Sequence, residues 1–202
     1  MSADSINKAT RRLPAWPLYV LGALPPVWLI FSGFTGGLGI DPVKVMEHQM
    51  GEWGLWLLIA GLAVTPLQRF AGVRLIKYRR AIGVLAFFYI FLHLLIWLVL
   101  DVQIVSQIIK DIYKRPYITI GMAAFVLMIP LGLTSNNWSL RKLGPRWRKL
   151  HKLVYLIVPL GGLHFLMLVK GFQIEPLVYL TGIATLLVLR IKLQRPRRAR
   201  AA

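Results

Sequence analysis

The chain of 202 residues contains no cysteine and few acids. The absence of cysteine excludes disulfide bonds, thiolate metal sites, Cys-ligated iron–sulfur clusters and covalently attached haem. Only 16% of the residues are charged, and these comprise 7 acids against 25 lysines and arginines. A soluble domain of this length has closer to a quarter charged residues, so the composition excludes a soluble enzyme. Histidine is then almost the only side chain left to ligate a cofactor.

Six long apolar segments separate the charged stretches, at residues 13–40, 53–68, 81–100, 116–140, 153–169 and 176–189. A membrane-spanning helix needs about 20 residues, and the three shorter segments reach this length with flanking charged side chains at headgroup depth. The pattern therefore predicts an all-α integral membrane protein, a six-transmembrane-helix bundle. Pro25-Pro26 predicts a kink or an interruption in the first helix.

The charges divide unequally between the two sides of this bundle. Six spans place both termini on one side, where residues 1–12, 69–80, 141–152 and 190–200 hold 20 basic residues and one acid. The segments of the other side hold 5 basic residues and 6 acids. Because basic loops stay in the cytoplasm, both termini are predicted to be cytoplasmic. Anionic lipid headgroups account for the basic tail, and no nucleic-acid-binding module is present.

Two histidines lie deep inside predicted spans. His93 follows Arg80 by 13 residues, and His164 follows Lys152 by 12. At about 1.5 Å per residue, both lie roughly 18–20 Å from the cytoplasmic ends of two helices that run in the same direction. Since an unpartnered imidazole is costly in hydrocarbon, the matched depth indicates a shared haem that takes one nitrogen from each histidine. Two separate core histidines, each bonded to a helix carbonyl, are the alternative.

The other two histidines have less certain roles. His151 lies 13 residues before His164, about 20 Å along the helix axis, where it could ligate a second haem. The third span offers no histidine at that depth, because Arg79 and Arg80 occupy it; these arginines suit haem propionates rather than iron. His151 is otherwise an interfacial histidine in a basic loop, and the axial rotation between it and His164 disfavours a common orientation. His48 is expected to be a solvated residue of a periplasmic loop.

Several sequence motifs, taken together, resemble one known family. They are GGLGIDPVKVMEHQMGEWGL, LAVTPLQRF, KYRRAIG, KRPYITIG and LTSNNWSLRKLGPRWRKLHKLVYL. Over about residues 15–190 the chain resembles the MsrQ (YedZ) family, the haem-binding membrane subunits of the bacterial periplasmic methionine-sulfoxide reductase system, within the ferric-reductase-like transmembrane superfamily. The resemblance assigns the haem histidines to His93, His151 and His164.

The resemblance also implies a setting and partners. A cytoplasmic segment at 1–14, a six-helix ferric-reductase-like haem domain at 15–190 and a basic cytoplasmic tail at 191–202 are expected in the bacterial inner membrane. Electrons would come from the quinone pool or a cytoplasmic flavin reductase. They would pass to a periplasmic molybdopterin-containing catalytic subunit, which reduces methionine sulfoxide in oxidised proteins. FMN is implied by the resemblance alone, since no flavin motif is recognisable.

Three other functions remain open on the sequence. A direct ferric or metal reductase would share the haem and differ only in its acceptor. A non-haem transporter or proton relay would use the intramembrane histidines, although no predicted span interior contains an acid or a lysine. A non-catalytic assembly factor would keep the histidines as core residues. The periplasmic loops at 35–52 and 101–116 are expected to dock the partner.

Overall fold

The structure, a computed structural model, describes residues 3–169 and 173–191. Within these ranges every regular element is helical, and no strand is formed. The all-α prediction is therefore confirmed for the described part of the chain. The predicted basic tail at 191–202 lies outside the described residues, apart from Ile191.

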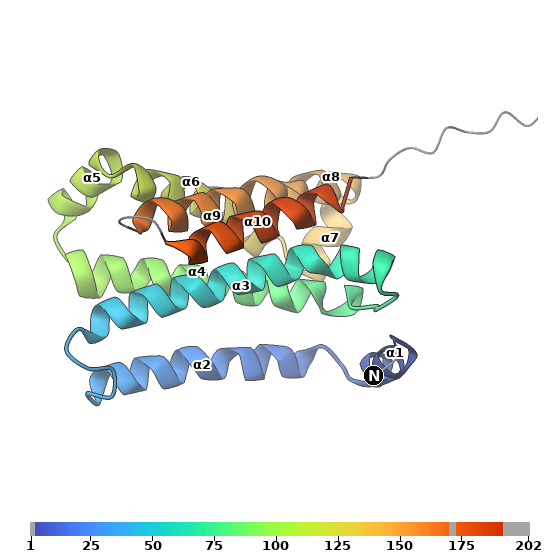
Figure 1. The fold of residues 1–202 in the computed structure, drawn as a ribbon. Coiled ribbons are helices and arrows are strands. Elements are labelled where there is room, and N and C mark those ends of the chain that lie inside the picture. The colour runs from blue at the N-terminus through green and yellow to red at the C-terminus, as the bar shows by residue number, and fades with distance from the viewer. Residues whose placement is uncertain (1–2, 170–172, 192–202) are drawn as a thin grey trace, which may run out of the picture.

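Long helices lie side by side and alternate in direction along the chain (Figure 1). They are α2 (Trp16–Phe34), α3 (Pro42–Phe70), α4 (Arg79–Ile96), α6 (Pro116–Leu133), α9 (Val154–Leu168) and α10 (Ile174–Val188). One end of the bundle carries α1 (Ala3–Arg12), α7 (Asn137–Leu143) and α8 (Pro145–Leu150), and the other end carries α5 (Val105–Lys114). Short helical turns are η1 (Ile76–Tyr78), η2 (Trp97–Val102) and η3 (His151–Leu153).

Five helical stretches are long and apolar enough to cross a membrane, which confirms a multi-pass membrane protein. They are Trp16–Phe34, Pro42–Phe70, Ile76–Val102, Pro116–Leu133 and Pro145–Leu168. The sixth helix, α10, is apolar but has only 15 residues. The C-terminal end of α10 lies on the side of the bundle that carries α1 (Figure 1). Six spans with cytoplasmic termini stay a prediction.

The predicted start of the second span at residue 53 is wrong. Helix α3 begins at Pro42, because Asp41 caps it by accepting a hydrogen bond from the Lys44 backbone N–H at 3.2 Å. The charged residues between Pro42 and residue 53 lower the apolar content of this segment, but they do not end the helix. As a result, most of the predicted loop 35–52 is helical, and His48 is an exposed residue of α3 rather than a loop residue.

Three further expectations about helix boundaries need correction. The fourth span ends at Leu133, not at residue 140, because Thr134 terminates α6 and the following residues form the separate helix α7. The predicted periplasmic loop 101–116 contains the helix α5. Finally, Pro25 and Pro26 lie inside α2, so of the predicted kink or interruption the interruption is wrong, and the kink stays a prediction.

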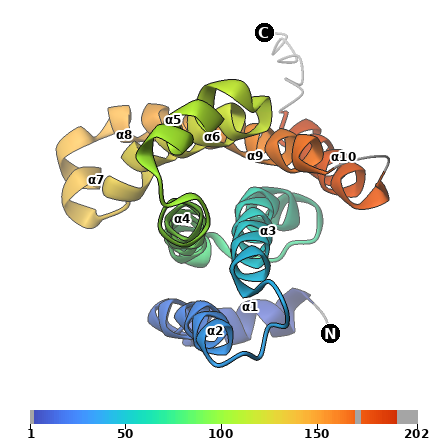
Figure 2. The ribbon, with the colours of Figure 1, turned by 90° about the vertical axis from the view of Figure 1, so that its left-hand side faces the viewer.

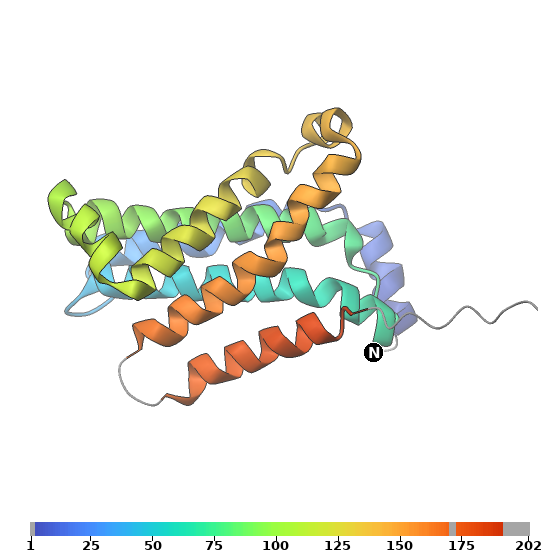
Figure 3. The same cartoon turned by 90° about the horizontal axis from the view of Figure 1, so that it is seen from above.

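The helices form three layers around two hairpins. Figure 2 shows α2 with the short helix α1 in one outer layer, α3 with α4 in the middle, and α6 with α9 and α10 in the third layer. Figure 3 shows that α6 and α9 cross the middle layer obliquely. Buried side chains from α3, α4, α6, α9 and α10 fill the space between the layers, among them Leu62, Ala86, Met128, Ile157 and Ile183. The hairpins α3–α4 and α6–α9 therefore frame the centre of the bundle.

Prolines inside the helices release backbone carbonyls, and side chains of other helices bind two of them. Proline has no N–H to donate one turn back, so Pro26 leaves the Gly22 carbonyl free and Pro66 leaves the Leu62 carbonyl free. The Tyr89 hydroxyl donates to the Gly22 carbonyl at 2.8 Å. The Arg190 guanidinium donates to the Leu62 carbonyl at 2.7 and 2.9 Å. In a bilayer these bonds replace water that is absent, and they tie the helices together.

We expect Tyr89→Phe to lower the free energy of unfolding in detergent by about 1 kcal/mol, because the Gly22 carbonyl loses its donor. Thermal unfolding followed by circular dichroism measures the change. Tyr113→Phe is the matched control, since the Tyr113 ring is 69% exposed. Equal stability of the two variants would contradict the role of the Tyr89 bond.

Candidate functional site

His93 on α4 and His164 on α9 meet at the centre of the bundle. Their ring centres lie 6.2 Å apart, and the ring planes are inclined by 77°. Helices α4 and α9 run in the same direction (Figure 1), and both histidines lie near the ends of their helices, on the side of the bundle that carries α5. The structure thus brings together the two residues whose depths match in the sequence.

Each of the two rings is held by a backbone carbonyl of the other helix in its hairpin. Nδ1 of His93 donates to the Glu47 carbonyl on α3 at 2.8 Å. Nδ1 of His164 donates to the Tyr117 carbonyl on α6 at 2.7 Å. A carbonyl can only accept, so both neutral rings carry their proton on Nδ1. This tautomer leaves the lone pair of each Nε2 available to a metal.

A glycine makes room for each ring one helical turn after the carbonyl. A Cβ atom at Gly51 would lie 3.0 Å from Nδ1 of His93, and one at Gly121 would lie 2.8 Å from Nδ1 of His164. Both contacts are too close for a side chain to be accommodated without moving the ring. Sequence reasoning missed these glycines. They lie in the motifs MGEW and ITIG, but a glycine inside a helix does not by itself indicate that a histidine ring of another helix packs against it.

The donor set fits a haem iron bound by two histidines. Two metal–nitrogen bonds of about 2 Å, each extended by about 1 Å to the ring centre, separate opposed imidazoles by roughly 6 Å, close to the observed 6.2 Å. Within the described residues, no buried side-chain nitrogen lacks a hydrogen-bond partner. Since no Nε2 bond is formed, each Nε2 faces accessible space. The carbonyl bonds of the core-histidine alternative therefore exist, yet they use only one nitrogen of each ring.

Aromatic side chains pack between the helices that carry and support the pair. Phe125 on α6 packs against both Phe87 and Phe91 of α4, with ring centres 6.1 and 6.5 Å apart. The Tyr117 ring lies 6.0 Å from the His164 ring. One turn after His93 the chain forms the π-helical turn Trp97–Val102, a widening that is common at functional sites. These features give an apolar surrounding suited to a porphyrin.

His151 lies in a separate environment near the opposite end of the bundle. Its Nε2 is 3.0 Å from the Thr134 hydroxyl, and its ring stacks on Trp147 at 3.8 Å. Arg80 donates to the Asn137 side chain at 2.6 Å, and Arg79 is exposed. The charges of both arginines act on His151. The structure thus groups the residues predicted for a second haem, but no other histidine of the chain reaches them.

Two acids, Glu47 and Glu52, lie in the first part of α3, ahead of the apolar segment predicted at 53–68. Glu47 contributes its backbone carbonyl to His93. The Glu52 carboxylate accepts hydrogen bonds from Tyr179 at 3.2 Å and from Gln49 at 3.3 Å. The extension of α3 to Pro42 places these acids on a candidate span. Among the described residues, no group of three acid or histidine side chains could hold a metal ion.

Comparison with known proteins supports a haem-binding membrane subunit. The ferric reductase-like transmembrane component family matches residues 50–162, a range that includes His93 and His151 and ends two residues before His164. A Brucella ovis protein named protein-methionine-sulfoxide reductase heme-binding subunit MsrQ is 50% identical over 177 residues, 87% of this chain and 80% of the relative. Relatives of the same name from Brucella anthropi and Brucella abortus are 49% and 50% identical, with the same coverage. No solved structure matches the chain.

We expect Gly51→Ala and Gly121→Ala each to weaken haem binding by about 10- to 100-fold, because the added methyl group displaces the ring and its carbonyl bond. Haem titration of the purified apoprotein, followed by absorbance, measures the affinity. Gly83→Ala is the control on α4, since a Cβ there meets no other atom within 4 Å. Unchanged affinity in both test variants would show that the glycines do not position the rings.

Proposed function

The chain belongs to the MsrQ family of haem-binding subunits within the ferric-reductase-like transmembrane proteins, and on this premise we propose that it is a b-type electron-transfer subunit of the bacterial inner membrane. It would carry electrons to a periplasmic methionine sulfoxide reductase. The observation that carries the proposal is the pair of opposed histidines, 6.2 Å apart, with both Nε2 atoms available. Relatives over most of the chain are named haem-binding subunits of that reductase system.

The chain's own contribution is positional. A haem, when bound, supplies an iron that accepts and releases single electrons. His93 and His164 would hold this iron through their Nε2 atoms. The Glu47 and Tyr117 carbonyls fix the orientation of both imidazoles and increase their basicity. The apolar side chains between the hairpins exclude water. No residue of the chain is assigned to the reduction of methionine sulfoxide itself, which would occur on the partner.

The position of the histidine pair indicates where the acceptor would dock. Both histidines lie near the end of the bundle that carries α5, and the positive-inside rule makes this end periplasmic. The molybdopterin-containing catalytic subunit would therefore bind over α5 and the loop between α2 and α3. In this region Asp111 pairs with Arg115 at 3.3 Å. The charged groups offered to a partner would then be the exposed Asp101 and the ion pair of Asp111 with Arg115.

The electron donor would act from the opposite end or from the bilayer. A cytoplasmic flavin reductase and the quinone pool are the two proposed donors, and FMN is proposed from the family resemblance alone. A direct ferric or metal reductase is the second candidate, because the matching family is described as ferric reductase-like. It needs the same histidine pair and differs only in the acceptor.

We expect His93→Ala and His164→Ala each to lose most of the absorbance band of reduced haem, because each removes one axial ligand. Spectra of purified protein with and without dithionite measure the band, and circular dichroism verifies folding. His48→Ala is the control, since His48 is exposed on α3. If both test variants kept the full band, the ligand assignment would be wrong. A wild-type protein without any band would favour a transporter or an assembly factor instead.

His151→Ala distinguishes one haem from two. If His151 ligates a second haem, the haem-to-protein ratio falls from two to one, whereas an interfacial histidine leaves the ratio unchanged. The pyridine haemochrome assay gives this ratio. Thr134→Val is the companion variant, because it removes the hydroxyl bonded to Nε2 of His151 while leaving the ring in place.

A further inference from the structure

Many basic side chains at the end of the bundle that carries α1 bind backbone carbonyls. Lys77 donates to the Thr10 carbonyl at 3.1 Å and to the Arg11 carbonyl at 3.2 Å. Arg69 donates to two carbonyls after α10, and Arg190 donates to carbonyls of α3. These cations serve the fold. A second group of cations has no hydrogen bond to a backbone carbonyl of the described residues, and it lines a hollow of about 410 Å³ together with an acid and an amide: Asp4, Asn7, Lys8, Arg11, Arg12 and Arg74.

The walls of this hollow are fixed to the bundle. Helix α1 lies across the ends of the long helices (Figures 1 and 3). The Asn7 amide donates to the Gly72 carbonyl at 3.0 Å, and its oxygen accepts from the Arg74 backbone N–H at 2.8 Å. These two bonds hold the Arg74 segment directly against α1. The hollow is thus built by α1 and by the connection that follows α3.

The negative end of α1 is neutralised at the same place. The last carbonyls of a helix carry partial negative charge and repel anions. Lys77 binds two of these carbonyls, and the Tyr78 hydroxyl donates to the Thr10 carbonyl at 2.9 Å. Arg11 and Arg12, in the last turn of α1, therefore present their positive charge without opposition from the helix end.

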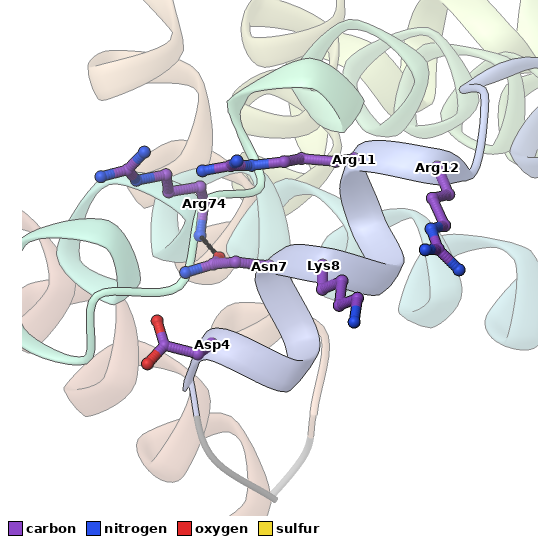
Figure 4. A pocket seen from close by; sticks show the side chains of 6 residues that line it. All are labelled: Asp4, Asn7, Lys8, Arg11, Arg12 and Arg74. Atoms are coloured by element: carbon purple, nitrogen blue, oxygen red, sulfur yellow. Dashed lines mark hydrogen bonds between the residues drawn. The ribbon is translucent and has the colours of Figure 1, made fainter.

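Two arginines that line the hollow extend their side chains in the same direction, and within the described residues neither forms an ion pair, although Asp4 also lines the hollow. Figure 4 shows the side chains of Arg11 and Arg74 extending toward the same side, whereas Lys8 and Arg12 point away along the other flank. Across the described residues, the single ion pair is the one between Arg115 and Asp111 at the opposite end of the bundle. Guanidinium groups that line one hollow offer several N–H donors, and such donors match the oxygens of a phosphate.

The depth of the hollow indicates the source of the phosphate. Trp16, four residues after Arg12, begins the first long apolar helix and is 65% exposed. Exposed tryptophan at the end of a span marks the membrane–water interface. The hollow therefore lies at the depth of the lipid headgroups.

We propose that Arg11 and Arg74 bind the phosphate group of an anionic phospholipid, with Lys8 and Arg12 adding attraction from the flank. The site is distinct from the histidine pair, and the proposal does not depend on haem. Bound lipid would fix α1 and the connection after α3 to the membrane surface.

Lipid binding by the purified full chain tests the proposal. Native mass spectrometry of detergent-solubilised protein counts retained phosphatidylglycerol, with phosphatidylcholine as the zwitterionic reference. We expect R11Q/R74Q to bind phosphatidylglycerol about 25-fold more weakly. The control R146Q/R148Q removes two exposed arginines of α8 at the same end of the bundle and should lose little affinity. Asn7→Ala, which keeps every cation but releases Arg74 from α1, should weaken binding as well.

A second arm identifies the source of the phosphate. If inorganic phosphate raises the melting temperature of the wild type but not of R11Q/R74Q, without selective lipid retention, the phosphate site stands and its ligand is soluble. Equal losses in the two double variants would reduce the effect to total charge and overturn the proposal. Undiminished phosphatidylglycerol binding by R11Q/R74Q would overturn it too. The reduced-haem spectrum of each variant verifies that the histidine site is intact.

Discussion

The hydrogen bonds from Nδ1 of His93 and His164 to backbone carbonyls are the interaction on which the site depends. In hydrocarbon no water can satisfy a ring nitrogen or a carbonyl, so both must find partners within the protein. Each bond fixes the position of its helix along the hairpin partner. It also sets the tautomer, and thereby leaves Nε2 for a metal. The same bond requires a glycine, because the ring can approach the carbonyl only where the next turn has no side chain.

The device occurs twice, in hairpins of nearly equal length. The carbonyl and the histidine are 46 residues apart in the α3–α4 hairpin and 47 apart in the α6–α9 hairpin. Yet the two hairpins show no useful repeat in sequence. Only the histidine and the glycine must be kept, since the carbonyl belongs to the backbone and can come from Glu47 or from Tyr117. A site of this kind constrains geometry far more than it constrains residue types.

The sequence was sufficient for features that depend on the mean apolar content of a long segment or on the number of residues along a helix. Apolar length predicted the multi-pass helical fold, and counting residues along two helices placed His93 and His164 at a common depth. Prediction from the sequence failed where a local interaction mattered more than the mean apolar content of the segment. Lys44, Glu47 and Glu52 lowered the apolar content of the first turns of α3, but the Asp41 cap and the buried Met46 and Met50 keep them helical. Gly51 and Gly121 could not be recognised, because their role lies in what a neighbouring helix brings against them.

The rule that governs the histidines also explains how the basic residues are used. The positive-inside rule counts every lysine and arginine on a side, but the structure divides them by what they bind. A proline leaves the Leu62 carbonyl without its helix N–H, and Arg190 donates a hydrogen bond to it. The end of α1 leaves carbonyls without helix partners, and Lys77 donates hydrogen bonds to them. A lysine or arginine whose N–H groups donate to backbone carbonyls has fewer N–H groups left to donate to a lipid headgroup. The proposed lipid site therefore uses Arg11 and Arg74, for which the described residues provide no carbonyl partner, and charge alone would not have singled them out.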